Sequence, residues 1–272
     1  MQGQGISMPK FKIDNVAEIN FVRAGPTGGR PIVFVHGVGL DLTWWGAQVE
    51  EFGQDHDVIA IDLPGHGLSG PLEVPLSFEV MTEVLIHLIE HLDAGSVHLV
   101  GISFGGMLAQ TLALARPDLV SSLSLLATLC TFPEPVRGAL RERARVARAE
   151  GMGRIAQLSN ERWFPADFRV RRPDVLDRAT RCLLQQDASF HACIWETIAT
   201  LDLETRLPDV SCPTMVIVGG EDVNAPMEAG SKIADLISGS ELHEISGLGH
   251  FPPFEAPEAF NKLLRRFLTG KG

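Results

Sequence analysis

The feature that most constrains the fold of this 272-residue chain is a short apolar stretch that leads through Gly-x-Ser-x-Gly into a helix-forming segment. Residues 96–100 are strand-like, Gly101 to Gly105 carry the motif, and residues 107–113 favour a helix. Such a strand–turn–helix holds a serine on a strained turn, where only glycine fits on either side, and points helix amides at the space before it. The layout predicts that Ser103 is a nucleophile.

Strand-like and helix-like segments alternate along the rest of the chain. Residues 31–35 and 57–61 are continuous apolar runs, typical of strands covered on both faces, whereas 19–22 alternate as in an antiparallel strand. Apolar positions at steps of three and four predict a helix over 77–92. Further strands are expected over 120–126, 213–218 and 241–245, and helices around 228–237 and 257–268. The alternation predicts an α/β fold with a mostly parallel, doubly wound sheet and a ligand site at its carboxyl edge.

The alternation stops over residues 131–206. This segment lacks β-branched runs, and four prolines, at 133, 135, 165 and 173, punctuate what look like short helices. We expect a helical cap over the catalytic edge of the sheet, inserted into an α/β core made of residues 1–130 and 207–272.

A serine nucleophile needs a base that a carboxylate orients. Asp222 follows one predicted strand directly, and His250 follows the next within a glycine-containing loop, so both reach the edge that carries Ser103. The order serine, acid, histidine is the one expected for a serine on such a turn. Asp222 is the predicted acid, with Glu221 and Asp62 as rivals for that role.

The negative oxygen formed during acyl transfer needs two hydrogen-bond donors. The predicted donors are the backbone amide of Phe104, directly after the nucleophile, and the backbone amide of Val38 in the His-Gly-Val-Gly loop after the first parallel strand. His36, at the start of that loop, is expected to brace it.

Taken together, the motifs resemble the α/β-hydrolase superfamily over nearly the whole chain. They are His36-Gly37, the Asp-Leu-Pro-Gly-His-Gly loop at 62–67, Gly-Ile-Ser-Phe-Gly-Gly at 101–106, Asp222 and Gly249-His250. The segments 161–165 and 257–261 resemble 3-oxoadipate enol-lactonases and related small esterases. That resemblance implies cofactor-free hydrolysis of a small ester or lactone that bears a carboxylate.

The formal net charge of −11 argues against nucleic acid or an anionic membrane surface as the main partner. No stretch approaches the length of a membrane span, and residues 1–7 lack the features of an export signal. The four cysteines are scattered without metal-ligand spacing. We therefore expect a cytoplasmic protein with reduced thiols and no metal site; the sequence sets no oligomeric state.

Charge is unevenly distributed, because residues 131–206 hold 13 Arg, no Lys and 11 acidic residues, whereas the remainder carries −13. A basic cap over an acidic body would steer an anionic substrate into the site. Most of these arginines are expected on exposed helix faces, paired with acids as in Arg-Glu-Arg at 141–143. Arg162 is the predicted exception, and Trp163 and Trp44 are predicted to line the substrate pocket.

Three other functions remain open from the sequence. Hydrolysis of a carbon–carbon bond in a vinylogous diketone uses the same triad with a cap arginine, although families of that kind usually carry tryptophan where this chain has Phe251. The sequence also resembles cofactor-free haloperoxidases and perhydrolases. The non-enzymatic alternative is a receptor that binds a ligand on a hydrolase scaffold.

Overall fold

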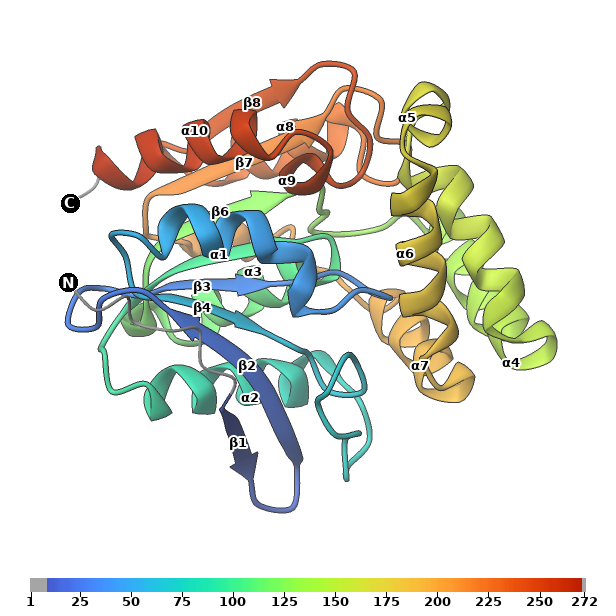
Figure 1. Ribbon diagram of the computed structural model, residues 1–272, viewed down its shortest axis with the longest axis horizontal. Helices are drawn as coiled ribbons and strands as arrows, with labels where there is room; N and C mark the ends of the chain where they lie inside the picture. The colour runs from blue at the N-terminus through green and yellow to red at the C-terminus, as the bar shows by residue number, and fades with distance from the viewer. Residues whose placement is uncertain (1–8, 271–272) are drawn as a thin grey trace.

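The computed structural model of the chain describes residues 9–270 and is built around one eight-stranded sheet (Figure 1). Its strand order is β1-β2-β4-β3-β5-β6-β7-β8. The strands are β1 (Lys10–Ile13), β2 (Ala17–Ala24), β3 (Ile32–Val35), β4 (Val58–Ile61), β5 (Val97–Ile102), β6 (Val120–Leu126), β7 (Thr214–Gly219) and β8 (Glu241–Ile245). The N-terminal segment that was expected to lack an export signal lies outside the described residues.

The sheet is antiparallel only at one edge. β1 pairs with β2 and β2 with β4 in antiparallel fashion, and all further pairs, from β4–β3 to β7–β8, are parallel. The mostly parallel sheet predicted from the sequence is thus confirmed, and the carboxyl ends of β3 to β8 share one edge. That edge carries the loops that form the site.

Helices cover both faces of the sheet, because the strands are apolar on both sides. Side chains that alternate along β3 and β5 enter two separate cores. One core lies under α2 (Phe78–His91), α3 (Phe104–Ala115) and α8 (Met227–Leu236). The other lies under α1 (Gly46–Phe52) and α10 (Pro257–Thr269). This is the doubly wound arrangement.

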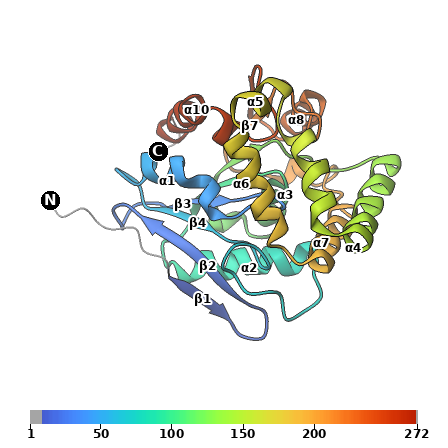
Figure 2. The ribbon, with the colours of Figure 1, turned by 45° about the vertical axis from the view of Figure 1, so that its right-hand side comes forward.

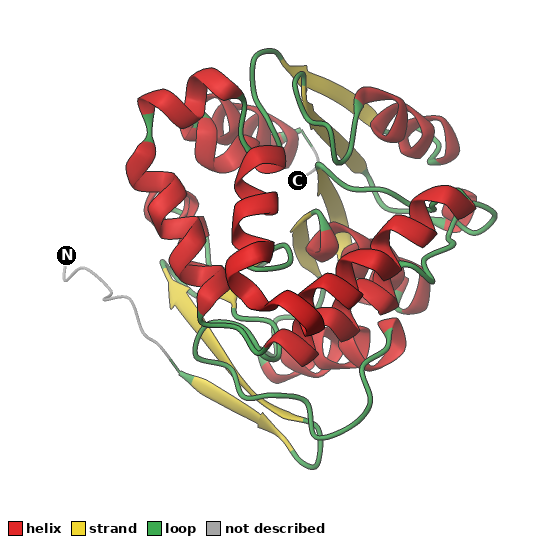
Figure 3. Ribbon diagram, turned by 90° about the vertical axis from the view of Figure 1, so that its right-hand side faces the viewer, coloured by secondary structure: helices red, strands yellow, loops and turns green. Residues whose placement is uncertain are grey.

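Four helices, here called the cap helices, stand over the carboxyl edge: α4 (Glu134–Trp163), α5 (Ala166–Arg171), α6 (Pro173–Leu184) and α7 (Ala188–Ile198). They lie to one side of the sheet in Figure 1 and face the viewer in Figure 3. α6 and α7 both pack against α4 (Figure 2).

The expectation that these helices are all short is wrong for α4, whose 30 residues form two helical stretches that meet at a kink at Gly151. The four prolines of the cap do not interrupt its helices, because each stands at or directly before the start of a helix. Pro133 and Pro165 are the residues before α4 and α5, and Pro135 and Pro173 lie in first turns. There proline lacks only an amide proton that has no partner in the helix.

The short elements that were not anticipated include β1, a 3-10 turn (Leu42–Trp45) with α1 directly after it, and α9 (Pro252–Glu255). Each spans only four to seven residues, too few for a periodic pattern of apolar positions to emerge. None of the described helices combines the length and apolar character needed to cross a bilayer.

Candidate active site

Ser103 occupies the strained turn between β5 and α3. Its backbone has φ 53° and ψ −117°, a conformation that L-residues rarely adopt. A side chain at Gly101 would place its Cβ 2.4 Å from the carbonyl oxygen of Gly105, and one at Gly105 would lie 2.3 Å from the carbonyl oxygen of Val35. Both glycines are therefore required by close backbone approach, as the motif predicted.

The imidazole of His250 lies between Ser103 and Asp222. Its Nδ1 is 2.7 Å from Oδ2 of Asp222, and its Nε2 is 3.0 Å from Oγ of Ser103. A carboxylate only accepts, so Nδ1–H donates to Asp222, and Nε2 of the neutral ring accepts from the serine hydroxyl. This is the geometry that a general base for a serine nucleophile requires.

Asp222 is held as an anion inside the protein. Burial alone would raise the pKa of this carboxyl, but His250 and the amides of Asn224 and Ala225 bind the charged form, and the net result is a lowered pKa. The rivals lie elsewhere. Glu221 is exposed, and the carboxylate of Asp62 accepts hydrogen bonds from Asn20 and from the amides of Leu42 and Leu68.

The loop after β3 runs directly beside Ser103. A Cβ on Gly37 would lie 3.2 Å from Cβ of Ser103. Within residues 9–270, the amide N–H groups of Val38 and Phe104 donate to no other group. These are the two amides that the sequence predicted as oxyanion donors.

Two neutral histidines fix this loop. His36 Nε2 accepts the amide of Leu63 at 3.0 Å, and His66 Nε2 accepts the amide of Gly39 at 3.3 Å, while each Nδ1 faces a backbone carbonyl oxygen. Burial lowers the pKa of His36 to about 4 and that of His66 to about 3. His36 therefore braces the loop as expected, and His66 binds the amide of Gly39 in the same loop.

A cavity of about 360 Å³ opens over the serine, between the sheet edge and the cap helices. Its volume lies in the range of small-molecule sites, about 300–1,000 Å³. Most of its lining is apolar, including Val38, Met107, Trp163 and Trp195. The polar side chains that line it are Ser103, Glu142, Arg143, Arg162, Asn224 and His250.

Arg143 is the site residue that the sequence analysis misplaced. It was expected on an exposed face paired with an acid, yet it is partly buried, lines the cavity, and pairs with no carboxylate of residues 9–270. Its guanidinium lies 4.5 Å over the ring of Trp195, and one terminal nitrogen donates to Ser159 Oγ at 2.5 Å. Burial and the nearby Arg162 lower the pKa of Arg143 to about 10.

The buried Nε of Arg143 has no hydrogen-bond partner within the described chain. The stacked tryptophan is itself fixed, because Trp195 Nε1–H donates to His191 Nε2 at 2.8 Å, and Nδ1 of His191 is bound to Gln186. The cap thus holds the guanidinium of Arg143 in place, and no described carboxylate forms an ion pair with it. Only the burial of one face of α4 against α7 identifies it, and no local motif does.

Arg162 and Trp163, which end α4, line the cavity and also bind the loops that carry Asp222 and His250. The Arg162 guanidinium donates to Asn224 Oδ1 at 2.9 Å and to the carbonyl of Val223, directly after the acid. The carbonyl of Trp163 accepts the backbone amide of His250 at 2.8 Å. Arg162 is therefore an exposed side chain engaged with the Asp222 loop.

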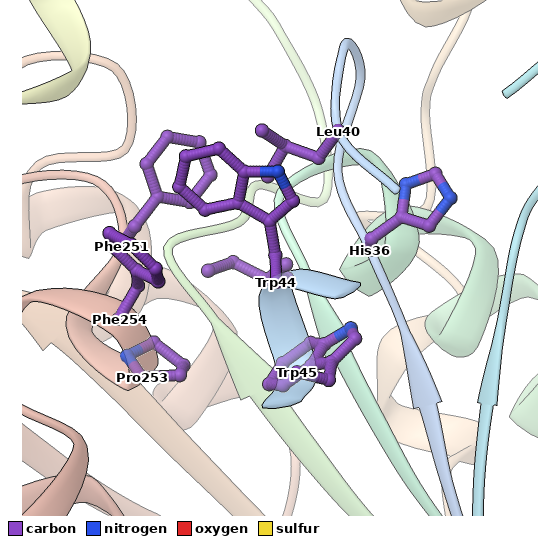
Figure 4. Close-up of a pocket in the computed structure, with 8 residues that line it drawn as sticks. His36, Leu40, Trp44, Trp45, Phe251, Pro253 and Phe254 are labelled. Atoms are coloured by element: carbon purple, nitrogen blue, oxygen red, sulfur yellow. The ribbon is translucent and has the colours of Figure 1, made fainter. Parts of the chain in front are cut away.

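Trp44 lies outside the cavity over Ser103. It lines a separate void of about 10 Å³, among Leu40, Phe251 and Phe254 (Figure 4). Arg178 lies 4.6 Å over its ring, and its indole N–H points to Cys182 Sγ. A void of that size holds no more than about one water molecule, so the structure does not place Trp44 with the other predicted pocket residues.

The described residues include no group of three or more histidine, cysteine or acidic side chains that could hold a metal ion. All four cysteines are free thiols.

Comparison with known proteins gives concordant results. The sequence profile of the alpha/beta hydrolase family matches residues 32–263. The chain is 28% identical to 3-oxoadipate enol-lactonase 2 of Acinetobacter baylyi over 243 residues, which cover 89% of this chain and 90% of that protein.

Two solved structures are also similar. The enol-lactonase from Burkholderia xenovorans superposes with a TM-score of 0.90 and 28% identity, covering 96% of this chain and 100% of that one. A thermophilic esterase from Thermogutta terrifontis, solved with malate bound, gives a TM-score of 0.88 and 30% identity, covering 97% and 99%.

Proposed function

Because this chain belongs to the alpha/beta hydrolase family, we propose that it is a cofactor-free serine hydrolase that cleaves a small carboxylic ester or lactone through an acyl-enzyme. The observation that carries the proposal is the hydrogen-bonded series Ser103–His250–Asp222 at the base of a cavity of small-molecule size. Residues 131–206 form the proposed cap over that cavity, and residues 1–130 and 207–272 the proposed hydrolase core.

The proposed reaction proceeds in two acyl transfers. His250 Nε2 takes the proton of Ser103 Oγ as that oxygen bonds to the carbonyl carbon, and the carbonyl oxygen becomes negative between the amides of Val38 and Phe104. The imidazolium, held by Asp222, then gives its proton to the leaving oxygen as the ester bond breaks. Water repeats the sequence on the acyl-enzyme, releasing the acid and restoring Ser103.

We further propose that the substrate carries a carboxylate. Arg143 supports this, because it lines the cavity and forms no ion pair with an acidic side chain of residues 9–270, so an anion would bind it without displacing a carboxylate; Glu142, which also lines the cavity, pairs with Arg145. The similarity to an enol-lactonase and to an esterase that was solved with malate agrees with such a substrate.

The test of the nucleophile is Ser103→Ala, compared with Ser231→Ala on α8. We expect the Ser103 variant to fold normally and to lose turnover on the order of a millionfold, because the triad acts as a unit. A fluorophosphonate probe should label wild type stoichiometrically at Ser103 and leave His250→Ala unlabelled. Turnover of Ser103→Ala within tenfold of wild type would reject the mechanism.

A panel of substrates then separates the reaction types. We expect carboxylate-bearing lactones and esters to be preferred over neutral p-nitrophenyl esters and over vinylogous diketones. Preference for the diketone would indicate a carbon–carbon bond hydrolase, and efficient peroxide-dependent chemistry would indicate a perhydrolase. Tight binding with neither turnover nor probe labelling would indicate a receptor.

A further inference from the structure

The loop that carries His250 has a composition that would leave it mobile. It connects β8 with the one-turn helix α9 (Pro252–Glu255) and contains Gly247, with φ 74°, and Gly249. A glycine loop samples many backbone conformations, whereas the imidazole must stay within hydrogen-bond distance of a serine on another element. Something outside the loop must therefore hold its backbone.

The backbone amides of three successive residues, 249 to 251, donate hydrogen bonds to groups outside the loop. Glu255 accepts the amide of Gly249 on Oε2 and the amide of Phe251 on Oε1, each at 2.9 Å. Between them, the amide of His250 donates to the carbonyl of Trp163. The carboxylate of Glu255 therefore binds the backbone on both sides of His250.

We propose that Glu255 is a positioning residue for the reaction, which aims the His250 imidazole by holding the amides of Gly249 and Phe251 with its two carboxylate oxygens. The inference rests on the proposed role of His250 as the base. A bond to the Phe251 amide alone would be explained as a helix-capping contact, because Phe251 directly precedes α9 and Glu255 is a residue of that helix. The second bond, to Gly249, lies outside the helix and has no such explanation.

The surroundings of Glu255 support the same role. The side chain is partly buried, and no lysine or arginine of the described residues forms an ion pair with it, so the charge is stabilised chiefly by the two loop amides. Burying a carboxylate without a cation costs stability. A glutamine would need less desolvation but would offer one acceptor and turn its NH₂ towards the second amide.

The experiment compares Glu255→Gln and Glu255→Asp with Glu258→Gln, an exposed neighbour on α10, each in the full chain. Active sites are titrated with the fluorophosphonate probe, and kcat per titrated site, KM and the labelling rate are measured. Glutamine loses one acceptor and aspartate is too short to span both amides. We expect each to lower kcat about tenfold, as misplaced catalytic groups do, with KM within twofold and labelling slowed in parallel; Glu258→Gln should match wild type.

A purely structural role would lower the melting temperature and the titrated fraction but leave kcat per site at the wild-type value, and that result would overturn the inference. If Glu255→Gln folds poorly, Glu255→Asp, which keeps the charge, decides by the same comparison. Failure of the hydrolase mechanism is distinguishable, because it would appear as retained turnover in Ser103→Ala whatever the Glu255 variants do.

Discussion

Arg143 is the side chain whose surroundings say most about the substrate. Its guanidinium is stacked on Trp195 and bonded to Ser159, and the acids near it in sequence are engaged elsewhere, since Glu142 pairs with Arg145. A cation so prepared binds an anion with little loss of side-chain freedom. The sequence favoured Arg162 for binding an anionic substrate, but the guanidinium of Arg162 donates its hydrogen bonds to the loop after Asp222.

Replacing Arg143 should therefore change substrate preference more than catalytic competence. We expect Arg143→Met to lower kcat/KM for a carboxylate-bearing lactone about 10- to 100-fold, the loss of a charge-assisted hydrogen bond, and to leave a neutral p-nitrophenyl ester within twofold. Arg154→Met, an exposed residue of the same helix, serves as the control. Equal losses on both substrates, or a greater selective loss in Arg162→Met, would assign the charge recognition elsewhere.

The sequence predicted the residues that local chain geometry places. Ser103, Asp222 and His250 each follow a strand at the same edge, so their convergence could be inferred before the structure was known. Arg143 and Trp44 depend on which face of a helix or turn meets a distant element. That rotation is set by packing between segments far apart in sequence, and local composition does not encode it.

At the scale of elements, the two parts of α4 make different contacts. Its first part, up to Gly151, carries Arg143 against α7, and its second part ends against the loops of Asp222 and His250. Gly151 separates them with φ 76° and ψ 178°, a combination open almost only to glycine. Apart from its chain neighbours and the backbone of α4 itself, no described atom lies within 4 Å of where its Cβ would stand, so the requirement for glycine is conformational and not a matter of packing space.

Two neighbouring glycines of α4 provide a matched test. Gly151→Ala should lower the free energy of unfolding by about 1–3 kcal/mol, the cost of holding alanine in that conformation. Gly153→Ala, whose Cβ also meets nothing within 4 Å and whose φ is not positive, should be neutral or stabilising by up to about 1 kcal/mol. Urea unfolding measures both; equal effects would show that the break in α4 is not fixed by Gly151.

The sequence predicted the strands of the core well, because a parallel strand buried on both faces is a continuous apolar run. It underestimated α4, since prolines that start helices look in a sequence like prolines that end them. It also left out β1 and α1, whose formation depends on β2 and on the packing of Phe52 against the sheet.

At the scale of the whole molecule, four histidines of residues 9–270 besides His250 are buried in different parts of the fold and are neutral. Burial lowers the pKa of His36 and His98 to about 4 and that of His66 and His191 to about 3. In the unfolded chain each would titrate near pH 6.5. Between these values the unfolded state binds more protons than the native state, so the native state loses stability as the pH falls.

Urea unfolding at pH 7.5, 6 and 5 should show this loss beginning near pH 6.5 and continuing towards pH 4, with each histidine contributing at most about 1.4 kcal/mol per pH unit. His98→Asn should reduce the slope, because the amide retains a polar partner for Ser122 but does not titrate. His98 lies in β5 away from the triad, so turnover at pH 7.5 should be preserved. An unchanged slope would mean that other groups govern the acid sensitivity.

The contact between the Trp163 carbonyl and the His250 amide has a consequence for anyone who recombines such proteins. Consider a chimera that takes its cap from another hydrolase, with the downstream splice point beyond residue 163. In such a chimera the foreign cap also supplies the carbonyl that binds the amide of His250. Grafts of that kind would alter the speed of the chemical step along with the choice of ligand, whereas grafts that retain the native chain from Arg162 onward would leave the speed to the recipient.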